Sequence, residues 1–208
     1  IILGSASPRR RELLEQIGIS FEVRVSDKEE VYHSLIPEEI VKELALSKAE
    51  NVADDLREKQ EQVKQISLDK KNNVLLDTIV IGADTIVVSD GSILGKPKDE
   101  ADAVRMIRSL QGRSHKVYTG VAILDYDDEG KRKSVVHAVE TEVFVNPMSD
   151  EEIREYAATG EPLDKAGAYG IQGQFAAYIE GIDGDYYNVV GLPVSYVYRQ
   201  LKEIAEKD

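Results

Sequence analysis

Apolar positions along the chain follow two periods, one typical of strands and the other of helices. Dense or alternating apolar residues predict strands at 1–3, 21–25, 77–89, 116–126, 134–146 and 175–179. Apolar residues spaced three and four apart predict helices that start near residues 8, 37, 99, 149 and 193. Because strands and helices alternate, we expect an α/β fold with a mixed, twisted sheet and flanking helices.

Small polar residues mark the expected ends of these elements. Ser7 is expected to cap the first helix through its hydroxyl, with Pro8 at the first helical position. Ser149 and Glu152 have the spacing of a capping box. Residues 127–130, DDEG, predict the turn of a β-hairpin.

The length of 208 residues fits one domain, and we expect residues 1–208 to form it. Residues 54–73 are mostly polar and charged. We expect them to form a surface insertion, a helix extension followed by a loop, and not a second domain.

Composition narrows the class of protein. No apolar run approaches the roughly 20 residues that span a bilayer, so we expect no membrane segment. Cysteine is absent, which excludes thiol chemistry and fits the reducing cytoplasm, where we expect the protein. The formal net charge of −13 argues against a nucleic-acid partner. The same charge would repel a nucleoside triphosphate, so a substrate of that kind would need a local basic pocket and a divalent cation.

The first fourteen residues, IILGSASPRRRELL, predict a strand, a turn of small residues and a helix. The N-terminus of such a helix binds anions, because free N–H groups and the positive end of the dipole point the same way. Arg9, Arg10 and Arg11 in the first turn oppose that dipole unless an anion lies before them. A solvated arginine surface is the alternative, and the local sequence leaves both open.

Asp84 lies in the middle of the apolar run DTIVIGADTIVVS. An unpaired buried carboxylate costs several kcal/mol, so an aspartate is unusual there. Either the strand bulges and turns Asp84 to solvent, or the carboxylate serves a cleft as metal ligand or general base. His33, His115 and His137 are too far apart in sequence for a metal motif, and we expect His115 to be structural.

Several segments together resemble one protein family. They are SASPRR at 5–10, GADT at 82–85, LGKP at 94–97, LQGRSHKVYTGVA at 110–122, DKAGAYGIQG at 164–173 and YYNVVGLPV at 186–194. In this order they resemble the Maf family, once called septum-formation inhibitors and regarded as nucleoside triphosphate pyrophosphatases. The resemblance runs from residue 1 to about 204, and the charged stretch at 54–73 is longer than the family pattern.

The resemblance implies a fold like that of inosine-triphosphate pyrophosphatases, with two lobes around a deep cleft, and a homodimer. The implied reaction converts a nucleoside triphosphate and water to the monophosphate and pyrophosphate, with Mg or Mn. Arg9, Thr85 and Gln172 resemble the set of the subgroup that acts on dTTP and UTP. The Gln172 amide offers a donor and an acceptor, which suits a pyrimidine edge.

By the same resemblance, Asp84 takes the position of the proton acceptor, and Glu30 and Asp84 are the metal candidates. The expected substrate-binding residues are Ser5, Ser7, Arg9, Arg10, Lys48 and Lys96. Asp164 and Lys165 form either a loop ion pair or a second tier of substrate contacts.

Two other functions remain open at this point. The subgroup that hydrolyses 7-methyl-GTP is similar, but it carries a tryptophan near the SPRR segment that this chain lacks. A protein that regulates septum formation by binding a partner would need no hydrolysis. The leading hypothesis is a house-cleaning pyrophosphatase for dTTP, UTP and modified pyrimidine nucleotides.

Overall fold

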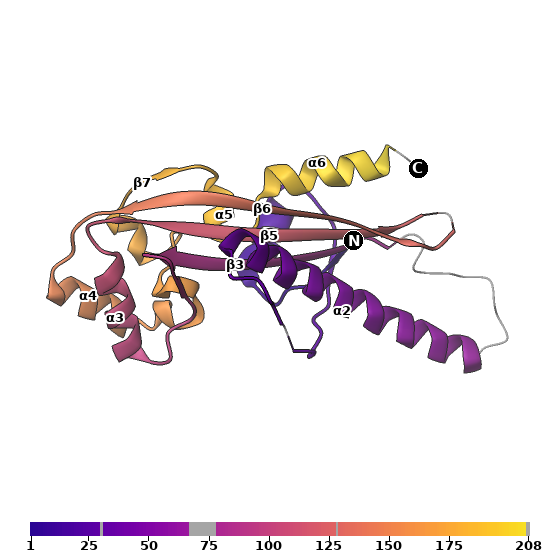
Figure 1. Cartoon of the computed structure of the whole chain (residues 1–208), viewed down its shortest axis with the longest axis horizontal. Helices are drawn as coiled ribbons and strands as arrows, with labels where there is room; N and C mark the ends of the chain where they lie inside the picture. The colour runs from indigo at the N-terminus through magenta and orange to yellow at the C-terminus, as the bar shows by residue number, and fades with distance from the viewer. Residues whose placement is uncertain (30, 67–77, 128, 207–208) are drawn as a thin grey trace.

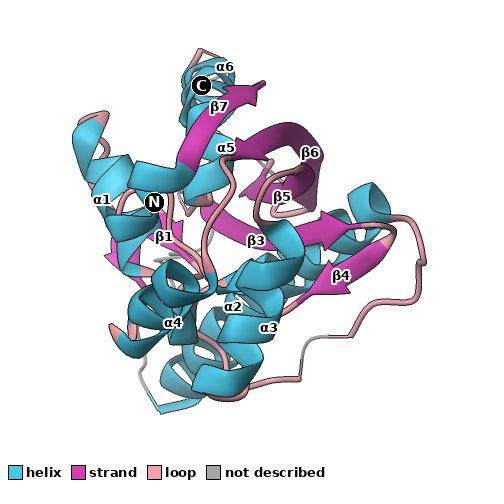
Figure 2. Ribbon diagram, turned by 90° about the vertical axis from the view of Figure 1, so that its left-hand side faces the viewer, coloured by secondary structure: helices cyan, strands magenta, loops and turns pink. Residues whose placement is uncertain are grey.

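One mixed sheet organises the fold, and helices cover both of its faces (Figures 1 and 2). The computed structural model describes residues 1–29, 31–66, 78–127 and 129–206, with only the backbone of 62–66. The strands are β1 (Ile2–Leu3), β2 (Glu22–Val23), β3 (Val80–Ser89), β4 (Ser92–Leu94), β5 (Ser114–Tyr126), β6 (Arg132–Val145) and β7 (Ile179–Asp183). The helices are α1 (Pro8–Gln16), α2 (Pro37–Ile66), α3 (Glu100–Leu110), α4 (Asp150–Ala158), α5 (Tyr186–Val190) and α6 (Val194–Ala205). Short 3-10 segments are η1 (Glu161–Asp164), η2 (Ala166–Ala168) and η3 (Gln174–Tyr178).

The strands follow the order β2-β1-β3-β5-β6-β7 across the sheet, and β4 pairs with β3. β1 runs parallel to both β2 and β3. The pairs of β3 with β4 and β5, of β5 with β6 and of β6 with β7 are antiparallel. This topology confirms the expected α/β fold with a mixed sheet.

One edge of β3 is left open in its middle. β1 pairs with β3 only as far as Leu3 opposite Ile81, and the chain then turns away from the sheet. β4 joins the same edge from Val87 onward. Between these pairings, no strand in the described part of the chain covers the edge at Asp84 and Thr85. Side chains from both faces of the sheet therefore meet at this gap.

Two glycines bring α2 unusually close to the sheet. A Cβ at Gly82 of β3 would lie 2.2 Å from the carbonyl oxygen of Ala45, and one at Gly120 of β5 would lie 2.0 Å from that of Val41. Any side chain at these positions would push the helix away. This contact fixes the height of α2 above β3.

The two faces of β3 serve different parts of the core. Val80 packs with Ala49 and Leu124 under α2. Ile81 faces the opposite way and packs in the larger cluster with Leu14 and other buried residues of α1, α3, α4 and α6. Figure 1 shows α6 and α2 on opposite sides of the long strands, with α3 and α4 gathered at one end.

Two expected strands are wrong in extent or position. Of residues 21–25 only β2 is a strand, and both of its residues are exposed, because β2 is the outermost strand of the sheet. Residues 175–179 were expected as a strand, but η3 and the start of β7 occupy them. The 3-10 turn places the ring of Phe175, which is fully buried, against those of Tyr156 and Tyr169 at 5.1 and 4.8 Å.

The boundary residues give a mixed outcome. The capping box of Ser149 and Glu152 is confirmed in both of its hydrogen bonds. Ser7 is the N-cap residue of α1, but its hydroxyl makes no capping hydrogen bond, so that prediction is wrong. α2 continues to Ile66, which confirms the helix extension, whereas residues 67–73 of the expected insertion lie outside the described residues.

Candidate active site

A cleft of about 410 Å³ opens at the uncovered edge of β3. It is lined by residues 4–10, Val25, Ser26, Lys28, Lys48, Asn51, Asp84, Thr85, Val87, Lys96, Val117, 164–166, 169–173 and 189–191. All the predicted substrate, base-selecting and catalytic side chains that the structure describes are in this set. Glu30, the other expected metal ligand, lies outside the described residues.

Asp84 and Lys48 form an ion pair inside the cleft. Lys48 Nζ donates to Asp84 Oδ1, and the two side chains are only 17% and 18% exposed. The pair follows from the close approach of α2, because Ala45 and Ala49, which flank Lys48 along the helix, touch the backbone at Gly82. Asp84 therefore faces a cleft and a cation, and the alternative of a bulge turned to open solvent is wrong.

Arg10 is buried in the wall of the cleft. Its Nε donates to the carbonyl of Gly191 at 2.8 Å, and its two terminal nitrogens donate to Ser5 Oγ at 2.9 Å and Thr85 Oγ1 at 3.0 Å. The guanidinium thus connects the turn before α1, strand β3 and the segment after α5. These bonds give Arg10 a role in the architecture of the cleft, while contact with substrate stays a prediction.

The loop of η1 supplies a second ion-pair cluster. Arg9 Nη1 lies 3.4 Å from Asp164 Oδ2, and Lys165 Nζ lies 2.7 Å from Asp164 Oδ1. Burial raises the pKa of Asp164, but the hydrogen bond from Lys165 and the charges of Lys165 and Arg9 outweigh it and hold that pKa below its usual value. The loop ion pair, one of the two alternatives for Asp164 and Lys165, is present. Both residues also line the cleft, and contact with substrate stays a prediction.

Lys96 and Gln172 enter the cleft from loops. Lys96 follows β4, Gln172 follows η2, and both are exposed. The Gly167 N–H donates to the Gly95 carbonyl at 3.1 Å, which ties the two loops together beside the cleft. This contact explains how residues far apart in sequence come to share one site.

The cleft is positively charged in an acidic protein. Among the described lining residues, the basic ones are Arg9, Arg10, Lys28, Lys48, Lys96 and Lys165, and the acidic ones are Asp84 and Asp164. Six basic groups against two carboxylates stand out in a chain of net charge −13. Such a local excess attracts a polyanion that the rest of the acidic surface repels.

Lys28, Asn51 and Tyr169 are among the lining residues that the sequence analysis did not single out. Lys28 lies in the stretch SDKEE at 26–30, where acidic residues outnumber it. It pairs with Asp55 at 2.9 Å, and this bond raises its pKa. Asn51 lies three residues after Lys48, so helical spacing could have placed both on one face. Tyr169 lies in the motif DKAGAYGIQG, from which only Asp164, Lys165 and Gln172 were selected.

His115 lies behind the cleft and not in it. It is buried, and its Nε2 lies 2.8 Å from the hydroxyl of Tyr169. Burial lowers the pKa of His115 to about 4, so the ring is neutral near pH 7. This position agrees with the expected structural role. In the described residues no three histidine, cysteine, aspartate or glutamate side chains are grouped as a metal site.

Comparisons with known proteins show the family of the chain. The family model described as Maf-like protein matches residues 1–204, and the chain belongs to that family. A protein of Agathobacter rectalis named dTTP/UTP pyrophosphatase is 47% identical over 204 residues, which cover 98% of this chain and 97% of the relative. A Bacillus cereus protein with the same name is 48% identical over 206 residues, covering 98% and 94%.

A weaker likeness joins the chain to a solved structure, a nucleoside-triphosphatase / dITP/XTP pyrophosphatase of Mycobacterium abscessus. It has a TM-score of 0.31 and 15% identity, and it covers 68% of this chain and 72% of that one. Among the described helices, none combines the length and apolar character needed to cross a membrane.

Proposed function

We propose that this protein hydrolyses dTTP and UTP to the nucleoside monophosphate and pyrophosphate. The observation that carries the proposal is that six basic side chains line the same cleft as Asp84 in an otherwise acidic chain. A triphosphate carries several negative charges, and its cleavage depends mainly on positioning and on charge stabilisation. The full-length relatives named dTTP/UTP pyrophosphatase support the substrate.

In the proposed reaction a water molecule attacks the α-phosphorus, and the bond to the oxygen that bridges the α- and β-phosphates breaks. Asp84 accepts the proton of that water through Oδ2, since Lys48 donates to Oδ1. Lys48 and Lys96 face the negatively charged phosphates. Cleavage is favoured because the repulsion between the phosphate charges is relieved when pyrophosphate leaves. Ser5 and Ser7 hold the turn before α1, where the Ser7 N–H donates to Ser5 Oγ at 3.3 Å.

The described residues fit a divalent metal ion. Mg²⁺ is usually held by one or two carboxylates together with substrate phosphates, so a cluster of three acidic side chains is not required. Asp84 supplies one hard oxygen ligand on the cleft wall, and we propose Glu30 as the second from its family position. When bound, Mg or Mn would neutralise phosphate charge and polarise the reacting group.

Base selection is assigned to Arg9, Thr85 and Gln172, all of which line the cleft. Replacing Gln172 by alanine should redistribute rates among bases, with one lost hydrogen bond worth roughly 1–3 kcal/mol. Equal loss on every nucleotide would contradict a selective role.

The homodimer and the cytoplasmic location stay predictions. Light scattering of the purified protein tests whether it is a dimer.

The decisive experiment measures pyrophosphate and orthophosphate release from dTTP, UTP, CTP, GTP, 7-methyl-GTP and ITP with Mg or Mn. The proposal expects pyrophosphate, with dTTP and UTP preferred. Asp84→Asn should lower the rate by about 10²–10⁴. Asp90→Asn is the matched control, because Asp90 is exposed, pairs with Arg113 at 2.7 Å and has a φ of 48° that asparagine tolerates. Release of orthophosphate, or equal rates for the two variants, would overturn the assignment.

A further inference from the structure

A line of hydrogen bonds leads from the cleft into the interior of the protein. Arg10 donates to Thr85 Oγ1 at 3.0 Å, Thr85 Oγ1 and Thr119 Oγ1 are 2.9 Å apart, and Thr119 Oγ1 donates to the main-chain carbonyl of Asn188 at 2.9 Å. Thr85 and Thr119 lie opposite each other on β3 and β5. Thr85 lines the cleft, whereas Thr119 is fully buried.

The direction of each bond follows from counting protons. A guanidinium only donates, a carbonyl oxygen only accepts, and each hydroxyl has one proton. Two oxygen–oxygen contacts at 2.9 Å, Thr85 with Thr119 and Thr119 with the Asn188 carbonyl, each need a proton between them. Only Thr119 can supply the one to the carbonyl, so Thr85 must supply the other.

This count fixes what Thr85 presents to a ligand. Its proton points inward to Thr119, and one of its two lone pairs accepts from Arg10. A single lone pair remains for the cleft. Thr85 lines the cleft, and the neighbouring residue 191 is glycine, where a Cβ would already be in contact with Thr85 Oγ1 at 3.5 Å. Thr85 therefore accepts and does not donate, which suits an N–H group and disfavours a phosphate oxygen.

We propose that Thr119 is a specificity-determining positioning residue, which turns the hydroxyl of Thr85 so that it accepts the N3–H of uracil or thymine. At the same place cytosine presents a lone pair, and two facing lone pairs repel. The inference rests on the proposed function, since it concerns the base of the same nucleotide. It assigns a role in recognition to a residue that is too deeply buried to touch the substrate.

Thr119→Val removes the acceptor of the Thr85 proton and changes little else. Valine has nearly the shape of threonine without its hydroxyl. The Asn188 carbonyl would keep a partner, because it also accepts from the Gly191 N–H at 3.0 Å. The Thr85 proton, however, would lose its acceptor and become available to the cleft. Thr119→Ser restores a hydroxyl at the same position.

The test measures binding of α,β-methylene UTP and α,β-methylene CTP by calorimetry, because these analogues resist cleavage at the reacting bond. The wild-type protein should bind the uracil analogue at least about tenfold more tightly. Thr119→Val should lower that ratio by about tenfold, and Thr119→Ser should restore it. A wild-type preference for the cytosine analogue, or no binding of either, would overturn the inference.

Thr141→Val is the matched control for general loosening of the same region. Thr141 is also a buried threonine; its hydroxyl accepts from the Asn188 side chain at 2.8 Å, but it makes no bond to Thr85. Its uracil-to-cytosine ratio should equal that of the wild type. An unchanged ratio in a folded Thr119→Val protein, or an equal shift in Thr141→Val, would refute the role of Thr119. Because binding is read without turnover, absence of pyrophosphate release would count against the proposed function alone.

Discussion

Gly82→Ala should displace α2 and thereby separate Lys48 from Asp84. The added Cβ would lie 2.2 Å from the Ala45 carbonyl oxygen and 2.8 Å from the Ala49 nitrogen, whereas real Cβ contacts stay beyond 3.0 Å. Both obstacles are main-chain atoms, so rotation of a side chain cannot relieve them. The helix must move outward by roughly 1 Å, an overpacking that costs about 1–3 kcal/mol.

The expected result has two parts. For a chain of this size, the loss of stability lowers the melting temperature by roughly 2–12 °C. A displacement near 1 Å of a group that positions the substrate costs on the order of 10²-fold in rate. We therefore expect kcat/KM for UTP to fall by about 10²-fold. Calorimetric melting and pyrophosphate release on the same preparation measure both parts.

Gly181→Ala is the matched control for this experiment. Gly181 also lies in a strand, β7, but a Cβ there would meet nothing within 4 Å. Its melting temperature should be unchanged or slightly higher. If Gly82→Ala melts and turns over like Gly181→Ala, then α2 does not sit on β3 as closely as the structure has it. A lowered melting temperature with full activity would instead refute the link between α2 and catalysis.

Two further predictions concern stability. Because burial lowers the pKa of His115 from 6.5 to about 4, the unfolded state binds the proton first. The free energy of unfolding should fall by roughly 3 kcal/mol as the pH drops between these two pKa values. Urea titrations at several pH values measure this fall, and it should be smaller in His115→Gln. Ser149→Ala removes the capping box of α4 and should cost about 1 kcal/mol in the same titration, while Glu152→Gln should keep most of it. A flat pH profile in the wild type, or no effect of Ser149→Ala, would contradict them.

Local features of the fold were accessible from sequence because short-range chemistry decides them. The helix starts at Pro8 and Pro37 and the capping box at Ser149 depend on residues within one turn of each other. The hairpin of β5 and β6 depends on the turn between two long apolar runs. The strand expected at 175–179 failed because aromatic packing around Phe175 overrode local preference.

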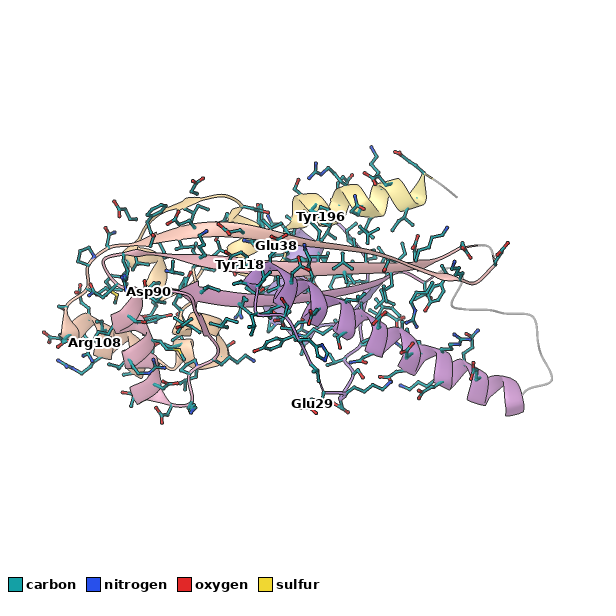
Figure 3. All side chains as sticks on the ribbon, in the orientation of Figure 1. Glu29, Glu38, Asp90, Arg108, Tyr118 and Tyr196 are labelled. Atoms are coloured by element: carbon teal, nitrogen blue, oxygen red, sulfur yellow. The ribbon has the colours of Figure 1, made fainter. Side chains whose placement is uncertain are left out.

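The sequence predicted which residues belong to the candidate site, but not which side chains they contact. The motifs selected Asp84, Lys48 and Arg10, and sequence spacing cannot show that Lys48 pairs with Asp84 or that Arg10 bonds to the segment after α5. A contact outside the cleft is equally hidden from the sequence: Tyr118 of β5 lies beside Glu38 of α2 (Figure 3). Contacts between distant segments depend on how helices settle on the sheet.

The sequence by itself determined the α/β class, the acidic character and the choice of candidate site residues, because composition, periodicity and motifs are properties of the chain. Tertiary structure alone decided that the edge of β3 opens at Asp84 and that six cations gather there. It also decided the direction that we infer for the Thr85 proton, since Thr119 lies beside Thr85 Oγ1 and itself donates to the Asn188 carbonyl. Hydrogen-bond direction is a property of neighbours in space, which linear order does not encode.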